Sequence, residues 1–378
     1  MSVFEAPSAG KTVRIFLCGD VMIGRGIDQI LPRPCPPLLH EPYLASAMDY
    51  VKLAEQASGR ITAPVDLSYP WGASLEKLES RRPDICIANL ETSATTSEDY
   101  EAKGINYRVS PANAACLRSL GVDICALANN HVLDWGQGGL LETLDTLERL
   151  GIRTAGAGRN LKEAQEPAVF PLPGRGRAVV FSFALPSGGT PRHWEATRDR
   201  PGVNFLPDLS GESLDHACDI IGASRKPDDL AVVSLHWGPN WSYEVPEEQR
   251  LFAHGLMDRA EVRIVHGHSS HHPKAIEIYR DRLILYGCGD FLNDYEGIGG
   301  DETYRGDLSL MFFADIDADN GELVALELAP LKVRRLRLEA ASPEDAEWMA
   351  QKLDSESVPF GVRVRKIARD SLRAEPAL

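Results

Sequence analysis

Five short apolar runs in this chain each lead into side chains that can bind a metal ion. The runs end in CGD, ANLE, ANNH, SLHWG and VHGHSSHH. The metal-competent residues at these ends are Asp20, Glu91, Asn130, His131, His236, His266, His268, His271 and His272. Short apolar runs are typical of buried strands, and in α/β folds ligands bind at the carboxyl ends of strands. We therefore predict that these side chains converge on one site, although they lie far apart in the sequence.

Each of these residues also has an ordinary structural interpretation. A single Asp after a strand is more often a turn or helix cap than a ligand, and Asn129 and Asn130 are common turn formers. His236 alone would more often be a core histidine, and Glu91 alone a solvated loop residue. Independent capping roles do not explain why every strand end carries a carboxylate, a carboxamide or an imidazole. The pattern as a whole therefore favours a shared metal site.

The ligand types indicate which ions this site would bind. Imidazole, carboxylate and carboxamide groups without cysteine suit divalent Mn, Fe, Zn or Co, and oxygen-rich positions also accept Mg or Ca. We expect one ion, or two if the Glu91 carboxylate bridges them. Such ions polarise carbonyl or phosphoryl oxygens and lower the pKa of a bound water, so the prediction is a metal-dependent enzyme.

Composition excludes several other classes of protein. The chain of 378 residues has 40 basic and 55 acidic side chains, and a net charge of −15 argues against binding along a nucleic-acid backbone. Its seven cysteines show no CxxC spacing, as expected of free thiols in a reducing compartment. We find no signal peptide and no apolar run of roughly 18 residues, so we expect a cytoplasmic protein without a membrane segment. The oligomeric state is left open.

Apolar strand-like runs alternate with helical patterns, which predicts an α/β fold. The predicted strands are Thr12–Cys18, Ile85–Leu90, Val122–Leu127, Ala178–Ala184, Leu230–Leu235 and Val262–Val265, and the predicted helices are Leu44–Gln56, Pro111–Leu120 and Gly138–Leu150. After about Ile276, the closely spaced runs IEIY, RLILYGCG, LSLMFFADI and ELVALELAPLKV indicate antiparallel strands. A helix over Pro343–Leu353 and a strand in VRVRKIA precede a polar tail. Proline-rich stretches at Leu31–Pro42 and Pro186–Pro207 are predicted to be long surface loops that frame the substrate.

The runs GDVMIGR, ANLETS, LANNHVLDWGQGG, HWGPNWSYEVPEEQ and GHSSHHPKAIEIY resemble the successive motifs of the CapA family, which is linked to poly-γ-glutamate capsule synthesis. The resemblance covers roughly Val13 to Asp294 with specific motifs and the C-terminal part more loosely. It implies the fold of calcineurin-like metallophosphoesterases, a four-layer α/β/β/α sandwich of two mixed sheets flanked by helices. It also implies that residues 10–300 form the metal-dependent catalytic core and that residues 301–378 complete the same domain.

The resemblance implies roles for individual residues. The implied metal ligands are Asp20, Glu91, Asn130, His236, His268 and His271, with Glu91 in the bridging position and His131 facing the substrate. Three features depart from the phosphoesterase pattern. Met22 stands where the first motif has a histidine, Glu91 is longer than the usual Asp, and Gly-His-Ser-Ser-His stretches the usual Gly-His-x-His. These departures count first against phosphoester hydrolysis.

The candidate acid and base groups are His131, Asp134, His272 and Asp290. Asp134 follows His131 by one helical turn and either orients its imidazole or caps a helix. Asp290, where the family usually has Asn, is a base or a turn residue.

Other side chains near these motifs each have two possible roles. Lys103 and Arg108 either meet a carboxylate substrate or form a solvated pair, and Trp237, Trp241 and Tyr243 either line a pocket or pack.

Three functions are consistent with these residues. One is metal-assisted epimerisation at an amino-acid α-carbon in peptide natural-product biosynthesis, as some members of this family are thought to perform. The others are poly-γ-glutamate synthesis or export, and metal-dependent hydrolysis of a phosphoester or amide. The missing membrane segment counts against the second and Met22 against phosphoester hydrolysis, so epimerisation of a peptide is the preferred prediction. The expected binding partner is a peptide or polyglutamate-like substrate. A non-enzymatic binding protein would hold metal without turnover.

Overall fold

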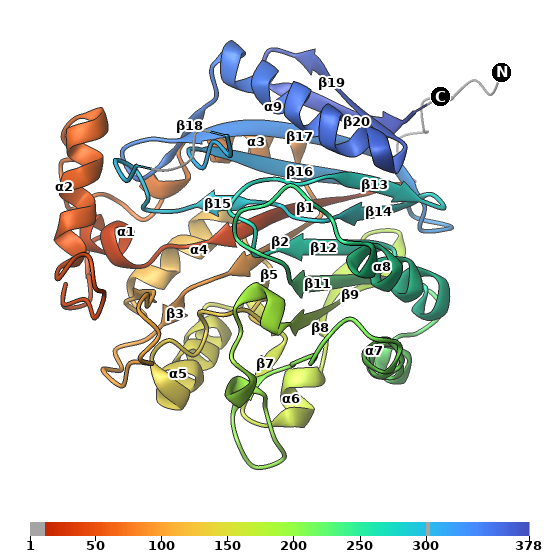
Figure 1. The fold of residues 1–378 in the computed structure, drawn as a ribbon, viewed down its shortest axis with the longest axis horizontal. Helices are drawn as coiled ribbons and strands as arrows, with labels where there is room; N and C mark the ends of the chain where they lie inside the picture. The colour runs from red at the N-terminus through yellow and green to blue at the C-terminus, as the bar shows by residue number, and fades with distance from the viewer. Residues whose placement is uncertain (1–11, 300–302, 378) are drawn as a thin grey trace.

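Two mixed β-sheets form the centre of the protein, whose computed structural model describes residues 12–299 and 303–377 (Figure 1). The first sheet has the strand order β19-β20-β17-β16-β1-β2-β5-β6, with β15 paired to β1 and β18 to β17. Its strands are β1 (Thr12–Val21), β2 (Ile85–Leu90), β5 (Ile124–Ala126), β6 (Arg153–Ala155), β15 (Asp290–Leu292), β16 (Leu308–Asp317), β17 (Leu323–Val333), β18 (Leu338–Ala340), β19 (Val362–Ala368) and β20 (Ser371–Pro376). From β1 to β6 the pairing is parallel, whereas from β1 to β19 it is antiparallel.

The second sheet has the order β13-β14-β12-β11-β9-β8. Its strands are β8 (Ala168–Leu172), β9 (Arg175–Ala184), β11 (Leu230–His236), β12 (Ile264–His268), β13 (Ile276–Tyr279) and β14 (Arg282–Leu285). The four central strands are parallel, and both edge strands are antiparallel to their neighbours. Two short pairs, β3 (Ser93–Ala94) with β4 (Arg108–Val109) and β7 (Ala157–Gly158) with β10 (Gly202–Val203), lie outside these sheets.

Alternating side chains bury both faces of each sheet, as the period of two in a strand requires. In β1, Ile15 and Leu17 face the second sheet and share a core with Val232 of β11. Phe16 and Cys18 point the other way, into a core with the helices. This double burial explains why the strands are almost continuously apolar.

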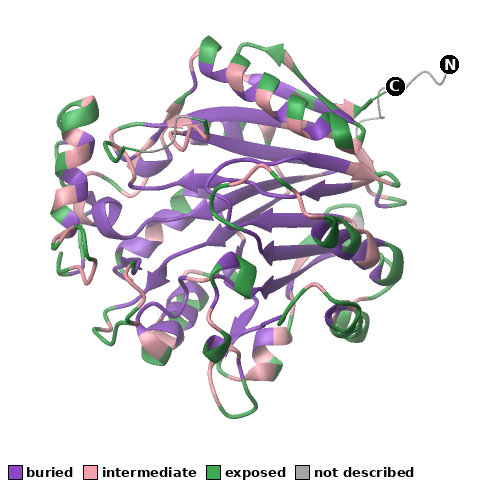
Figure 2. Ribbon diagram, viewed as in Figure 1, coloured by how far each residue is buried: buried purple, intermediate pink, exposed green. Residues whose placement is uncertain are grey.

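Helices cover the two outer faces of the sheets. Against the first sheet lie α3 (Ala73–Arg81), α4 (Cys116–Leu120) and α5 (Gly136–Arg149), and against the second lie α7 (Gly211–Ser224) and α8 (Glu247–Ala260). The remaining helices are α1 (Arg25–Ile30), α2 (Ala47–Ser58), α6 (Leu161–Gln165) and α9 (Pro343–Ser357), which packs on β19. Figure 2 shows the central strands buried and the outward sides of the helices exposed. The predicted four-layer sandwich is confirmed.

Within the described ranges, no helix has both the length and the apolar character needed to span a bilayer.

Several predicted elements differ in detail from those observed. The helix predicted over Pro111–Leu120 is a 3₁₀ turn at Asn113–Ala115 followed by α4, and the Asn113 side chain there donates to Asp28 at 2.6 Å. The polar tail predicted after the VRVRKIA strand contains a further strand, because Ser371–Pro376 forms β20 with Leu372 buried. The antiparallel prediction for the RLIL strand holds for its pairing with β13, but β14 also pairs in parallel with β12.

Both proline-rich stretches contain less irregular structure than predicted. The region predicted as a loop from Pro186 to Pro207 includes two 3₁₀ turns and strand β10. In the stretch from Leu31 to Pro42, Leu38 forms an isolated bridge with Ser46.

Gly19 permits the close approach of β1 to the segment before β15. A Cβ atom at this position would lie 1.8 Å from the Gly289 carbonyl oxygen. We expect Gly19→Ala to lower the free energy of unfolding by about 1–3 kcal/mol or more, because the backbone must move. Gly222→Ala is the control, since it lies exposed in α7 with no atom within 4 Å of the added Cβ, and it should stabilise the protein by about 0.5–1 kcal/mol. Denaturant unfolding measures both, and equal stability of the two variants would contradict the close approach.

Candidate metal centre

The carboxyl ends of strands from both sheets meet in one buried cluster. Two groups of three side chains have ligand atoms within 4.8 Å of one another, namely Asp20 with His236 and His268, and Asp20 with His271 and Asp290. All five residues are buried. Because Asp20 belongs to both groups, its carboxylate is the point that the two sets of ligands share.

Asp20 and Asp290 are neighbours because the same tripeptide occurs twice. Cys-Gly-Asp ends at Asp20 in β1 and again at Asp290, where β15 begins. The two aspartates are register partners in a parallel pairing, and the Asp20 amide donates to the Gly289 carbonyl at 3.0 Å. The repeat in the sequence could have indicated this pairing.

Two asparagines that the sequence analysis did not select hold the carboxylates in place. The Asn89 amide donates to Asp20 at 2.7 Å and to Glu91 at 3.2 Å. The Asn129 side chain in turn donates to the side-chain oxygen of Asn89 at 3.0 Å, and its own oxygen accepts from the backbone amide of His131 at 3.0 Å. In the sequence, the Ala-Asn pair that occurs in both ANLE and ANNH could have drawn attention to these two asparagines.

A chain of hydrogen bonds determines which nitrogen of His268 carries the proton. The Cys18 carbonyl only accepts, so His266 Nε2, 2.9 Å away, carries a proton. His266 Nδ1 then accepts from the Ser234 hydroxyl at 3.1 Å, and Ser234 Oγ accepts from His268 Nε2 at 2.7 Å. The lone pair of His268 is therefore on Nδ1, which lies 3.9 Å from the Asp20 carboxylate. Orientation of a ligand imidazole through its other nitrogen is common in metal sites.

His236 and Asn130 carry buried polar atoms without partners among the described residues. His236 Nδ1 lies 2.8 Å from His268 Nδ1 and 3.9 Å from Glu91, whereas its Nε2 has no hydrogen-bond partner. Asn130 Oδ1 is likewise buried without a partner. Unsatisfied buried groups are costly, and a cation is one means of satisfying the Asn130 oxygen. His236 faces His268 and Glu91 through Nδ1, so its Nε2 points away from them.

The longer Gly-His-Ser-Ser-His turn brings His271 back to Asp290. Ser269 has a φ of 99°, an uncommon backbone conformation for a residue with a side chain, and its amide points at Asp20 with an N–O distance of 3.3 Å. His271 Nδ1 then lies 2.8 Å from Asp290 Oδ1, while Asn293 donates to Asp290 Oδ2 at 2.8 Å.

His131 forms a second imidazole–carboxylate pair beside Glu91. Its Nδ1 lies 2.6 Å from Asp134, which also accepts the Tyr107 amide at 2.6 Å and lies 2.7 Å from the Lys103 ammonium. This leaves His131 Nε2 facing Glu91 at 3.7 Å. Asp134 therefore orients the imidazole, and it does not cap α5, which begins at Gly136. Lys103 is only 19% exposed and does not form the solvated pair that was the alternative.

The electrostatics of the cluster favour a bound cation. Burial, and then the neighbouring Asp290, raise the pKa of Asp20 to about 7, and burial with the nearby Asp20 raises the pKa of Glu91 well above its usual range. Burial lowers the pKa values of His236 and His268 well below normal, so both rings are neutral. Burial also lowers the pKa of His271, but the Asp290 carboxylate outweighs it and the net pKa is raised. Carboxylates that need a positive charge beside neutral imidazoles are compatible with a divalent metal ion.

Three residues that were singled out in the sequence, His272, Met22 and Trp237, make structural contacts outside this cluster. His272 accepts the Ser242 amide at Nε2, and its other nitrogen faces the Pro273 carbonyl, so both nitrogens face backbone groups. Met22 is fully buried, and its sulfur accepts from the Tyr295 hydroxyl at 3.5 Å. Trp237 packs in the core with its indole N–H on the Tyr286 carbonyl.

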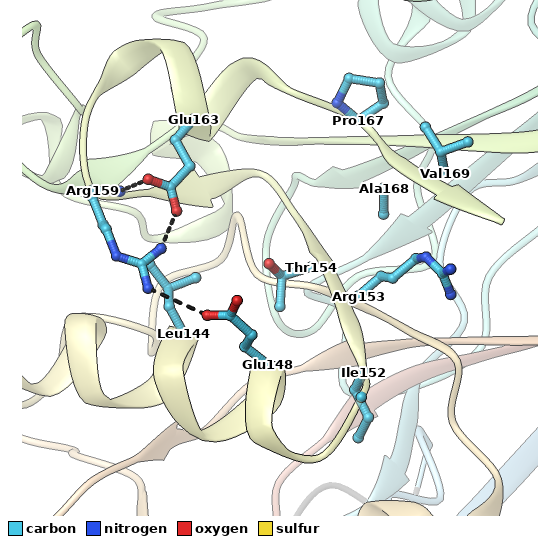
Figure 3. A pocket seen from close by; sticks show the side chains of 11 residues that line it. Leu144, Glu148, Ile152, Arg153, Thr154, Arg159, Glu163, Pro167, Ala168 and Val169 are labelled. Carbon is cyan, nitrogen blue, oxygen red and sulfur yellow. Dashed lines mark hydrogen bonds and ion pairs between the residues drawn. The ribbon is translucent and has the colours of Figure 1, made fainter.

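A pocket of about 600 Å³ lies elsewhere, between α5, β6, α6 and β8. It is lined by none of the predicted site residues. Its Arg159 lies between Glu148 and Glu163 and pairs with Glu163 at 2.5 Å (Figure 3). The pocket is therefore separate from the candidate metal centre.

Comparison with known proteins decides the family. Residues 14–295 match the model of the bacterial capsule synthesis protein family PGA_cap. A probable polyglutamine synthesis accessory protein of Mycobacterium tuberculosis is 45% identical over 368 residues, which is 97% of this chain and 96% of the relative. The chain belongs to the PGA_cap family. The predicted CapA resemblance is confirmed.

More distant relatives of this PGA_cap protein include the PGA biosynthesis protein CapA of Bacillus subtilis, 26% identical over 57% of this chain and 54% of the relative. The capsule biosynthesis protein CapA of Bacillus anthracis is 24% identical over 74% of this chain and 59% of the relative. Among solved structures, a phosphatase from Mycoplasma pneumoniae aligns with a TM-score of 0.48 and 12% identity, over 89% of this chain and 96% of the phosphatase.

The hydrogen-bond chain through Ser234 gives a test of the metal centre. We expect Ser234→Ala to weaken divalent-metal binding by about 10- to 100-fold, because His268 Nε2 loses the partner that keeps its proton away from Nδ1. The control is Ser182→Ala, since Ser182 lies beside Ser234 in β9 and its hydroxyl has no hydrogen-bond partner among the described residues. Calorimetric titration of both variants with Mn²⁺ and Zn²⁺ would measure the change. Equal affinities in the two variants would rule out this role for Ser234.

Proposed function

We propose that this PGA_cap protein is a metal-dependent enzyme that hydrolyses an amide bond in a glutamate-containing chain during polymer synthesis. The observation that carries the proposal is the buried cluster in which two groups of ligands share Asp20. The family supports the substrate class, because the relatives are named for capsule, PGA or polyglutamine synthesis. The chemistry of the site supports hydrolysis, since clusters of this type activate water next to a polarised carbonyl.

The side chains suggest two positions for divalent ions. His236 and His268 with Asp20 would form the first, with Glu91 and Asn130 beside it, and His271 and Asp290 with Asp20 would form the second. The first is richer in nitrogen and suits Mn, Fe, Zn or Co, while the second has two carboxylates and also accepts Mg or Ca. In this proposal Asp290 is a ligand and not a base. Bound ions would polarise the amide carbonyl and lower the pKa of water.

His131 is the proposed proton carrier. His131 Nδ1 donates a hydrogen bond to Asp134 Oδ2, with the two atoms 2.6 Å apart. The lone pair is therefore on His131 Nε2, which faces the cluster. His131 would accept a proton from the attacking water as the new C–O bond forms, and deliver it to the departing nitrogen as the C–N bond breaks. The sum of these steps adds one water across the amide. The side chains of His131 and His271 are each 9% exposed, against 1% or less for His236 and His268, so we place the substrate on their side of the cluster.

We further propose that the catalytic core comprises residues 10–300 and that residues 301–378 complete the same domain. In support, β16 pairs with β1 along six residue pairs, and β17, β20 and β19 extend the same sheet. The proposed boundaries at residues 10, 300 and 301 lie outside the described residues.

Epimerisation, the function preferred from the sequence, has less support than polymer synthesis. The relatives named above are capsule or polymer synthesis proteins. Their names agree better with poly-γ-glutamate synthesis, which was the alternative to epimerisation. The proposed hydrolysis and epimerisation differ in what they do to the substrate. Hydrolysis adds the elements of water, whereas inversion at an α-carbon exchanges one hydrogen and leaves the chain intact.

The test uses oligomers of γ-linked glutamate in water enriched in ¹⁸O, with Mn²⁺ or Zn²⁺ added. We expect shorter products with ¹⁸O in the new carboxylate, loss of turnover with chelator, and a drop of about 10²- to 10⁴-fold in kcat for His131→Asn. His254→Asn is the matched control, because His254 also pairs with a carboxylate, Glu277 at 3.0 Å, but on helix α8. Mass spectrometry would follow the products.

Other results would reject the hydrolase. An intact oligomer that gains one deuterium per turnover in D₂O would restore epimerisation. Metal binding with neither cleavage nor exchange would indicate a binding protein.

A further inference from the structure

Four aromatic side chains form a platform beside the candidate metal centre. They are Trp241, Tyr243, His272 and Tyr304, and we call this set the aromatic platform. Tyr243 and Tyr304 stack on each other with centroids 5.3 Å apart, and the His272 ring lies 4.3 Å from Tyr243 and 4.6 Å from Tyr304. The side chains come from three separate segments: the β11–α8 connection, the turn after β12, and the residues before β16. Their convergence is therefore a product of the tertiary fold.

His272 contributes a flat neutral ring to the platform. Its Nε2 accepts the Ser242 amide at 3.2 Å, and its Nδ1 faces the Pro273 carbonyl at 3.3 Å. Trp241 lies nearly parallel to it, with an interplanar angle of 17° and a centroid distance of 6.2 Å. Because the His272 ring is fully buried and both its nitrogens face backbone groups, it supports the other rings of the platform rather than transferring a proton.

Trp241 connects the platform to the metal centre and to solvent. Its ring centroid lies 5.2 Å from that of His271. It is 45% exposed, whereas Trp71, Trp135, Trp194 and Trp237 are at most 2% exposed. A large exposed aromatic surface next to a reactive site is typical of a ligand-binding surface.

Two lysines lie near the platform. The Lys352 ammonium, from α9, is 3.6 Å from the centre of the Tyr243 ring and pairs with Glu356 at 2.9 Å. Lys274 is buried and donates to the Glu244 carbonyl. The aromatic faces and the Lys352 ammonium are complementary to a ligand that alternates methylene and amide groups with carboxylates.

We propose that the aromatic platform is a subsite that holds the part of the glutamate chain extending beyond the reacting amide. The methylene and amide groups of one unit would lie on the Trp241 ring, and its carboxylate would approach Lys352. The distance of 5.2 Å between Trp241 and His271 makes the subsite continuous with the cluster, which identifies its occupant as the substrate of that cluster. The inference rests on the proposed function, since it assumes that the cluster acts on such a chain.

Trp241 also provides the measurement. Among the tryptophans of the described residues it is the one with a large exposed surface, so acrylamide should quench its fluorescence preferentially. A γ-linked glutamate hexamer should protect this fluorescence from quenching, and Trp241→Phe should remove the protected component. Trp241→Ala should weaken hexamer binding about five- to tenfold by calorimetry, as expected for loss of an aromatic contact. Trp348→Ala, a half-buried tryptophan on α9, is the control and should leave the affinity unchanged.

The outcomes separate this inference from the proposed reaction. Protection of Trp241 without any cleavage by the wild-type protein would support the subsite and reject the hydrolase. Protection retained in Glu91→Gln, with cleavage lost, would support both. The subsite is overturned if the hexamer does not bind, if it binds without protecting Trp241, or if polyacrylate of matched charge protects equally. Melting curves for both Trp241 variants would exclude unfolding as the cause of lost binding.

Discussion

The burial of several carboxylates in one place is the constraint on which the rest of the site depends. Asp20, Glu91 and Asp290 lie in the interior, where like charges repel strongly and water does not screen them. The amide of Asn89 bridges two of these carboxylates, and His271 pairs with the third. These contacts satisfy part of the negative charge, and divalent cations would satisfy the remainder.

The fold and the site depend on each other through the strands that carry the ligands. His266 in β12 donates to the Cys18 carbonyl in β1, so one hydrogen bond joins the two sheets directly behind the cluster. The same imidazole begins the chain through Ser234 that leaves the lone pair of His268 on Nδ1. A change that separates the sheets would therefore also disturb His268, and in the proposed metal centre this would couple the stability of the sandwich to metal affinity.

Much of this arrangement could be predicted from the sequence, because strand ends in an α/β fold converge and because apolar runs with polar ends are easy to recognise. The strand Ile85–Leu90 was predicted with its observed bounds, and β20 was missed because its alternation is short and its outward residues are charged. Asn89 and Ser234 were not predicted, since they lie within the apolar runs and act only through tertiary contacts. The side-chain directions of His271 and His272 were also beyond reach, because they depend on the turn at Ser269.

The most direct test of the shared cluster is the number of divalent ions bound by three variants of the full chain. Equilibrium dialysis against Mn²⁺ or Zn²⁺, with metal analysis, would compare Asp20→Asn, His268→Gln and Asp290→Asn with the wild type. We expect Asp20→Asn to lower the bound ratio more than either other change, because its carboxylate belongs to both groups of ligands. Wild-type ion content in Asp20→Asn, with melting curves that show an intact fold, would contradict the shared centre.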